Sequence, residues 1–279
     1  MLTLSAPAKI NLTLEVLGQR ADGYHQLASV VQSISLEDTL SFQPNKEIHL
    51  VCNLPELISS DNLVIRAARL LQEVSGCRKG ATIFLNKGIP PAAGLGGGSS
   101  DAAATLNGLN QLWELGFHLE KLRELASKLG SDVPFFLYGG TALVEGRGNE
   151  ITPLPSPTPF WLVLAKSPLN ILNKTEKMYA SLNPSHFTGG NFTQKVVDAL
   201  HRGDKITSSL CYNVFEQIAF LRPELEQYRR CFIAAGAGSV HLAGAGPTLF
   251  TLIEKEAQGE KLLWNMKCCG MEAYLARTL

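Results

Sequence analysis

Polar and apolar residues alternate along the first forty positions of the chain, a pattern typical of strands with one buried face. The runs "LSAPAKINLTLEVLG" (4–18) and "LASVVQSISL" (27–36) both follow it. Between them, "ADGYH" (21–25) contains an Asp-Gly pair, which favours a tight turn. The sequence therefore predicts that the chain begins with strands joined by short turns.

A helix and a strand are predicted to follow. Residues 61–75 place apolar side chains at helical spacing, with Ser60 or Asp61 as the predicted N-cap and Gly76 as the residue that ends the helix. The alternating run "ATIFLNKGI" (81–89) predicts a strand that leads directly into a glycine-rich stretch.

A second amphipathic helix is predicted for "LEKLRELASKLG", ending at Gly130. The segment "SDVPFF" then opens another element. Asp132 is placed to cap that element, and Pro134 falls within its first turn.

The densest proline cluster, "PLPSPTPF" (153–160), is the natural domain boundary. It divides the chain into an N-terminal domain, residues 1–155, and a C-terminal domain, residues 156–279. The pattern beyond it predicts a strand at 160–165, helices near 174–182, 193–202 and 212–230, a glycine-rich strand pair, and a final helix and strand.

Composition narrows the class of protein. The 279 residues are 45% hydrophobic and carry a formal net charge of +0, so bulk charge indicates neither nucleic acid nor an anionic membrane surface as a partner. Lys9 and Asn11 interrupt any apolar leader, and the uncharged run from Cys231 to Ile253 is broken by glycines. We expect a cytoplasmic protein with no membrane segment and no protein partner implied.

Cysteine and histidine spacing argues against a zinc site. The six cysteines form no CxxC pair and the six histidines show no HExxH spacing. The cysteines are expected to be reduced and mostly buried.

The glycine-rich stretch "IPPAAGLGGGSSDAAATL" (89–106) joins the predicted strand to a helix expected to begin near Ser99 or Ser100. Glycines in front of a helix N-terminus let backbone N–H groups approach phosphate oxygens. A Walker loop is excluded because no lysine follows the glycines. The dinucleotide fingerprint is excluded because Ser99 or Asp101 stands where its third glycine is required.

Four segments, in this order, resemble the motifs of the GHMP kinase superfamily, which includes galactokinase, homoserine kinase and mevalonate kinase. They are "PAKINL" (7–12), the loop "PxxxGLGxxSS" from Pro90, "LGSDVPFF" (129–136) and "LAGAGPTLF" (242–250). "DGYH" and "GLGGGSSDAA" resemble one branch in particular. Its kinases phosphorylate a cytidine-diphosphate derivative of a sugar alcohol on the non-mevalonate route to isoprenoid precursors.

The resemblance implies an α+β fold in two lobes, an N-terminal ribosomal S5-like domain and a C-terminal ferredoxin-like domain. It implies ATP as the phosphoryl donor, together with Mg²⁺. No acidic cluster identifies the metal ligands, and Ser99, Ser100 and Asp132 are possible contacts.

The resemblance also assigns roles to residues. Lys9 and Asp132 are the implied catalytic pair, in which the carboxylate accepts the hydroxyl proton and the cation keeps it charged. The residues alone leave Asp132 as a plain helix cap and Lys9 on the solvent face of a strand. The implied phosphate-binding residues are Pro90, Gly94, Leu95, Gly96, Gly97, Gly98, Ser99 and Ser100. The implied substrate-binding residues are Asn11, Tyr24, His25, Thr175, Tyr179, Gly244 and Gly246.

Several of these assignments have ordinary alternatives. "GYH" is also compatible with an exposed turn, and Tyr179 with a buried helix tyrosine. Pro247 lacks an N–H group, so its backbone cannot donate a hydrogen bond to phosphate. Two functional alternatives also stay open: another small-molecule kinase of the homoserine or mevalonate type, and a catalytically silent nucleotide-binding relative.

Overall fold

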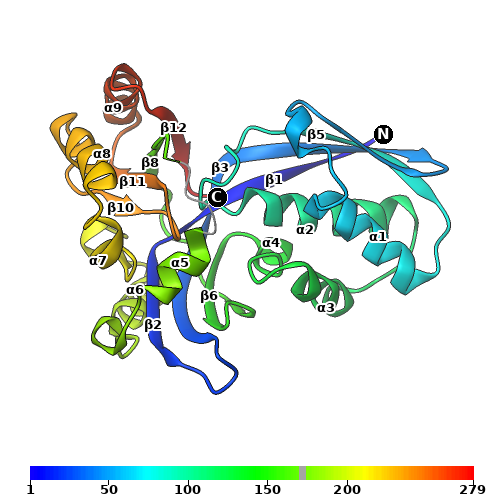
Figure 1. Ribbon diagram of the computed structural model, residues 1–279, viewed down its shortest axis with the longest axis horizontal. Coiled ribbons are helices and arrows are strands. Elements are labelled where there is room, and N and C mark those ends of the chain that lie inside the picture. The colour runs from blue at the N-terminus through cyan, green and yellow to red at the C-terminus, as the bar shows by residue number, and fades with distance from the viewer. Residues whose placement is uncertain (170–173) are drawn as a thin grey trace. The chain divides into compact units, whose positions relative to one another are not determined.

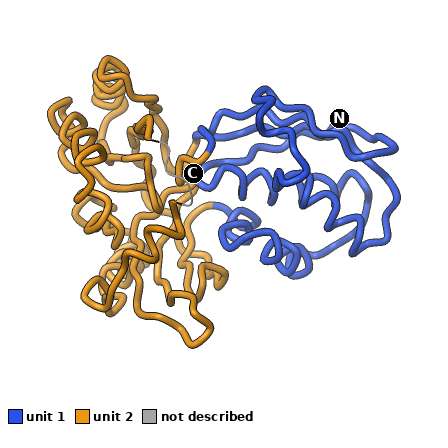
Figure 2. The backbone as a smooth tube through the Cα atoms, viewed as in Figure 1, with its two compact units in different colours: residues 1–8, 36–91, 96–139 blue, residues 9–35, 92–95, 140–279 orange. Residues whose placement is uncertain are grey.

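Residues 1–169 and 174–279 are described by the structure, a computed structural model (Figure 1). They form two compact units that interleave along the chain (Figure 2). Unit 1 comprises Met1–Ala8, Leu36–Pro91 and Gly96–Gly139, and unit 2 comprises Lys9–Ser35, Ala92–Leu95 and Gly140–Leu279. This is a different division from the one at residue 155, which stays a prediction.

The predicted N-terminal strands are present: β1 (Leu2–Asn11), β2 (Thr13–Gln19) and β3 (His25–Asn45). In unit 1, the second half of β3 pairs antiparallel with β5 (Gly80–Asn86), which pairs in parallel with β4 (Ile48–Cys52). The helices of this unit are α1 (Leu63–Ser75), α2 (Gly97–Leu112), α3 (Leu119–Leu129) and α4 (Phe135–Tyr138), with a 3₁₀ turn at Pro55–Leu57.

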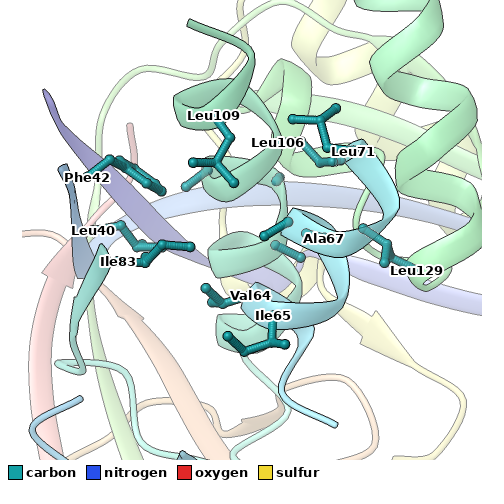
Figure 3. Packing of buried hydrophobic residues seen from close by; sticks show 14 of the residues in the cluster. Leu40, Phe42, Val64, Ile65, Ala67, Leu71, Ile83, Leu106, Leu109 and Leu129 are labelled. Carbon is teal, nitrogen blue, oxygen red and sulfur yellow. The ribbon is translucent and has the colours of Figure 1, made fainter. Parts of the chain in front are cut away.

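Apolar side chains from the strands and helices of unit 1 make one core (Figure 3). Phe42 and Ile83 project from the strands, while Leu71 and Leu106 project from α1 and α2, and all four are fully buried. Full burial of such a side chain stabilises the fold by roughly 1.5–3 kcal/mol. Gly108 allows α2 to pack closely, since a Cβ there would lie 2.5 Å from the Phe42 ring.

The helix boundaries of unit 1 correct some predicted caps. Asn62, rather than Ser60 or Asp61, caps α1, because its side chain accepts the Val64 N–H at 2.9 Å. Gly76 ends that helix in the left-handed conformation, as predicted. The helix α3 ends at Gly130, also as predicted.

In unit 2, β2 and the first half of β3 pair with each other, and each also pairs with a further strand on its other side. The further strand beside β3 is β6 (Thr141–Gly146), which in turn pairs with β7 (Glu150–Pro153). On its other side, β2 pairs in parallel with β9 (Tyr212–Asn213). A separate antiparallel sheet has the order β10 (His241–Leu242), β11 (Thr248–Ile253), β8 (Trp161–Lys166) and β12 (Glu272–Arg277).

The helices of unit 2 are α5 (Lys174–Ala180), α6 (Asn191–Arg202), α7 (Glu216–Ala219), α8 (Pro223–Ala234) and α9 (Glu256–Cys268), with 3₁₀ turns at Pro184–His186 and Ser208–Leu210. The helix α9 packs on the four-stranded sheet, where a Cβ on Gly259 would lie 2.3 Å from Ile253. The helix predicted at 212–230 is wrong: β9, α7 and α8 divide that range, and Pro223 opens α8.

The six cysteines are free, but the expectation that most are buried is wrong, because Cys268 and Cys269 are exposed at the end of α9 and only Cys52 is classed as buried. Within the described ranges, no helix is long and apolar enough to cross a membrane.

Candidate active site

The glycine loop enters α2 two residues earlier than predicted. Gly96, in the left-handed conformation at φ 73°, is the N-cap, and the helix begins at Gly97 rather than at Ser99 or Ser100. Ser100 N–H donates to Gly96 O at 2.9 Å in the first helical turn. No side chain caps this helix, so its first N–H groups are suited to an anion.

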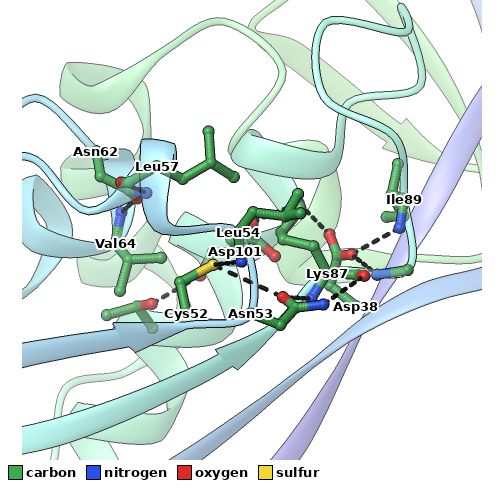
Figure 4. Close-up of polar contacts among 12 residues, drawn as sticks. Asp38, Cys52, Asn53, Leu54, Leu57, Asn62, Val64, Lys87, Ile89 and Asp101 are labelled. Atoms are coloured by element: carbon green, nitrogen blue, oxygen red, sulfur yellow. Dashed lines mark hydrogen bonds and ion pairs between the residues drawn. The ribbon is translucent and has the colours of Figure 1, made fainter.

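Buried charges lie beneath the first turns of α2 in unit 1 (Figure 4). Lys87 Nζ makes ion pairs with Asp38 and, at 2.8 Å, with Asp101 on α2. Asp38 also accepts the N–H groups of Gly88 and Ile89 at 2.7 and 2.8 Å. One carboxylate therefore holds the end of β5, and the lysine connects it to the helix that follows the loop.

Burial governs the protonation of this group. Burial raises the pKa of Asp101 to about 7, opposed by the Lys87 charge and reinforced by the Asp38 charge. Burial alone would lower the pKa of Lys87, but the charges of Asp101 and Asp38 outweigh it and raise that pKa. No sequence motif predicts a role for these three residues. The sequence offers one signal, a charged residue, Asp101, among the small residues at the start of α2.

In unit 2, the backbone of Ala92–Leu95, in the first glycine loop, lies against the backbone around a second glycine loop, residues 244–247 ("GAGP"). A Cβ on Gly94 would lie 2.5 Å from Ala243 O and 2.7 Å from Gly246 O. A Cβ on Gly244 would lie 3.1 Å from Gly94 O. Position 94 thus requires glycine for two reasons, the close approach of these carbonyl oxygens and its positive φ of 82°. The second loop is held by Asn213, whose side-chain amide donates to Leu242 O and Gly244 O, both at 2.8 Å.

Lys9 and Asn11 lie at this junction. The Lys9 N–H donates to Leu95 O at 2.9 Å, and Lys9 Nζ donates to Asn11 Oδ1 at 2.8 Å. Both side chains would lie 3.8 Å from a Cβ on Gly244. Lys9 is only 6% exposed, so the alternative that placed it on the solvent face of a strand is wrong.

A second lysine, missed from the sequence, lies at the same junction. Lys174 Nζ donates to Gly246 O and, at 3.1 Å, to Ala92 O, so it connects the two glycine loops. Burial lowers its pKa to about 8, helped by the positive charges of Lys9 and Lys166. No motif identified Lys174, because both partners are backbone carbonyls distant in sequence.

The predicted aromatic residues do not form one group. His25 stacks on Tyr179, with ring centroids 5.1 Å apart and an interplanar angle of 23°, and Phe187 contacts the His25 ring edge-on. Burial lowers the pKa of His25. Tyr24 is instead 57% exposed, with the Arg147 guanidinium 4.8 Å from its ring centroid. Thr175 is exposed in α5.

Asp132 lies exposed in the turn before α4, in unit 1. The N-cap of α4 is Pro134 and no side chain caps that helix, so the prediction that Asp132 caps it is wrong. Pro90 is buried at the start of the first glycine loop, whereas Gly98 is exposed. Among residues 1–169 and 174–279, no group of three or more His, Cys, Asp or Glu side chains could hold a metal ion.

Comparison with known proteins identifies the class. The family description "GHMP kinases N terminal domain" matches residues 62–140, and "GHMP kinases C terminal" matches residues 196–269. Together these matches cover more than half of the chain, which therefore belongs to the GHMP kinases, ATP-dependent enzymes that phosphorylate small molecules. The predicted α+β fold with both GHMP kinase domains is confirmed.

Relatives that match over their full length share one name. A protein of Dehalococcoides mccartyi named 4-diphosphocytidyl-2-C-methyl-D-erythritol kinase is 48% identical over 281 residues, which cover 100% of this chain and 99% of that protein. A protein of Geobacillus kaustophilus with the same name is 42% identical over 284 residues, covering 100% and 97%. The crystal structure of 4-(cytidine 5'-diphospho)-2C-methyl-D-erythritol kinase has a TM-score of 0.85 and 34% identity and covers 99% of each chain.

Proposed function

We propose that this chain transfers the terminal phosphoryl group of ATP to the 2-hydroxyl of 4-diphosphocytidyl-2-C-methyl-D-erythritol, in the non-mevalonate route to isoprenoid precursors. The observation that carries the proposal is the burial of Lys9 and Asn11 beside both glycine loops. The shared name of full-length relatives up to 48% identical supports the substrate.

Phosphoryl transfer depends on positioning and on neutralising charge more than on covalent chemistry. In our proposal the N–H groups of Gly96–Ser100 bind the ATP phosphates at the start of α2, with Pro90, Gly94 and Leu95 shaping the loop. Asp132 accepts the hydroxyl proton, and Lys9 supplies positive charge to the reacting groups. The meeting of Lys9 and Asp132 stays a prediction.

The cytidine end of the substrate is assigned to His25, Tyr179 and Tyr24, with Asn11, Thr175, Gly244 and Gly246 as further contacts. Stacked rings suit recognition of a flat base, and a polar ring edge can read its hydrogen-bonding groups. His25 and Tyr179 are already in contact, so a base that enters between them must separate the two rings.

Mg²⁺ is expected to accompany ATP, because this cation binds phosphate oxygens and keeps several waters. It would neutralise phosphate charge during transfer. Ser100 offers a candidate protein oxygen: its hydroxyl is buried and has no hydrogen-bond partner among the described residues.

A panel assay tests the proposal. The purified chain is given ATP and Mg²⁺ with 4-diphosphocytidyl-2-C-methyl-D-erythritol, homoserine or mevalonate in separate reactions, and ADP and phosphomonoester are measured. We expect both products with the cytidine substrate only. Phosphorylation of homoserine or mevalonate instead would favour another GHMP kinase activity, and no product with any alcohol would favour a silent relative.

A further inference from the structure

A chain of buried hydrogen bonds in unit 2 begins at Lys9. Lys9 Nζ donates to Asn11 Oδ1, and Asn11 Nδ2 donates to Ser29 Oγ, each at 2.8 Å. The Ser29 hydroxyl in turn donates to the backbone carbonyl of Thr13. Asn11 and Ser29 are 7% and 2% exposed, so solvent cannot readily replace these bonds.

The donors and acceptors fix how the Asn11 amide is turned. An ammonium group only donates, so it requires the amide oxygen of Asn11. The single Ser29 hydroxyl hydrogen is used by the Thr13 carbonyl, so Ser29 Oγ accepts from the amide nitrogen. Lys9 and Ser29 therefore require the same orientation, in which Asn11 Oδ1 faces Lys9, and Ser29 holds the nitrogen end of the amide.

The far end of this chain is anchored in secondary structure. Thr13 Oγ1 accepts the Val30 N–H at 2.9 Å and the Thr193 hydroxyl at 3.0 Å. Thr193, in the first turn of α6, donates its N–H to the buried carboxylate of Glu15 at 2.6 Å. The support behind Ser29 thus comes from β2, β3 and a helix N-terminus together.

We propose that Ser29 is a positioning residue for phosphoryl transfer: it holds the Asn11 amide so that its oxygen faces the Lys9 ammonium. The proposal rests on the function proposed above. Ser29 acts through Asn11. Without its hydroxyl the Asn11 Nδ2 group loses its buried acceptor, and only the Lys9 ammonium still holds the amide in place. A small misplacement of a group at a reacting centre can cost up to about a hundredfold in rate.

The test compares Ser29→Ala with Ser33→Ala. Ser33 lies four residues along the same strand, is equally buried, and has a hydroxyl with no hydrogen-bond partner in the described part of the chain. We expect Ser29→Ala to lower kcat about tenfold or more and to raise KM for the cytidine substrate, while KM for ATP stays within about twofold because the backbone of the phosphate loop is untouched. Ser33→Ala should match the wild type, and Ser29→Thr, which keeps the hydroxyl, should recover most of the rate.

A second measurement keeps the inference separate from the proposed function and from folding defects. Hydrogen exchange of the Asn11 side-chain amide, assigned by NMR with Asn11→Asp, should be slow in the wild type and in Ser33→Ala and faster in Ser29→Ala or, if that variant does not fold, in Ser29→Cys. Equal kinetics for the two alanine variants, or equal exchange in the hydroxyl-lacking and wild-type proteins, would overturn the role of Ser29. A wild type that phosphorylates no alcohol would overturn the proposed function, leaving the exchange result to decide on Ser29.

Discussion

At the scale of single residues, the sequence predicted the glycines and Lys9 but not the groups that hold them. Lys9 and Gly94 lie in motifs whose spacing can be read directly. Lys174 and Asn213 bind backbone carbonyls that are 29 or more positions away in the chain, and no periodicity reports such contacts. The motifs therefore predict which residues belong to the site, and contacts between distant segments support those residues in the fold.

The close approach of the two glycine loops predicts that Gly94→Ala is damaging. A Cβ there collides with two carbonyl oxygens, and φ is 82°. We expect a loss of about 1–3 kcal/mol in the free energy of unfolding. Gly98→Ala is the matched control, since its Cβ would meet only Leu63 at 3.7 Å and its φ lies outside the left-handed range. Urea unfolding of both variants checks this, and equal midpoints would count against the packing argument.

The stack of His25 on Tyr179 predicts a ligand-specific loss. Stacking on a base is worth roughly 1–3 kcal/mol, so His25→Ala should weaken the cytidine substrate about five- to a hundredfold. ATP binding should be unchanged, because the phosphate loop is a separate element. Titration of each ligand measures this, with exposed His49→Ala as control. Unchanged affinity for the cytidine substrate would remove His25 from the site, and a loss of ATP binding instead would mean that the two ligands are wrongly assigned.

At the scale of elements, strong apolar periodicity predicted where helices lie, but it did not report the local contacts that begin, end or replace an element. The helices α1 and α3 lie close to where the apolar spacing placed them. The predicted helix at 212–230 failed because the Asn213 side chain accepts the Phe215 N–H and holds the second glycine loop, which favours a short strand there. The start of α2 was predicted too late in the chain, because its N-cap is Gly96 in the left-handed conformation and not a serine that caps with its hydroxyl.

The group that ties α2 to β5 predicts a pH-dependent stability. The pKa of Asp101 is about 7 in the folded chain, against about 3.9 when unfolded. Between those values the folded state holds a proton that the unfolded state has lost, so the contribution of Asp101 to stability falls as pH rises from about 4 to about 7. We expect the wild type to lose more stability between pH 5 and pH 7 than Asp101→Asn, which cannot titrate.

Melting temperatures at both pH values provide the measurement. Asp61→Asn is the control, because it also removes one carboxylate but from an exposed position. Its melting temperature should change with pH as that of the wild type does. Parallel slopes for the wild type and Asp101→Asn would show that the buried carboxyl does not hold a proton in this range.

At the scale of the whole molecule, the sequence predicted the α+β class and both GHMP kinase domains but not the interleaved compact units. The proline cluster suggested one cut near residue 155. The structure assigns Lys9–Ser35 and Ala92–Leu95 to the same unit as the C-terminal residues, because β2 pairs with β9 and Gly94 packs against the second glycine loop. Pairings between distant segments leave no trace in local periodicity.

The central claim is phosphoryl transfer to the cytidine substrate with Asp132 as the proton acceptor. The most direct measurement is kcat with ATP and 4-diphosphocytidyl-2-C-methyl-D-erythritol for the wild type, Asp132→Asn and the control Asp61→Asn, an exposed aspartate of the same unit. We expect Asp132→Asn to lose about a hundredfold or more in kcat with an unchanged melting temperature, and Asp61→Asn to match the wild type. An Asp132→Asn protein that turns over within a few-fold of the wild type would contradict the account.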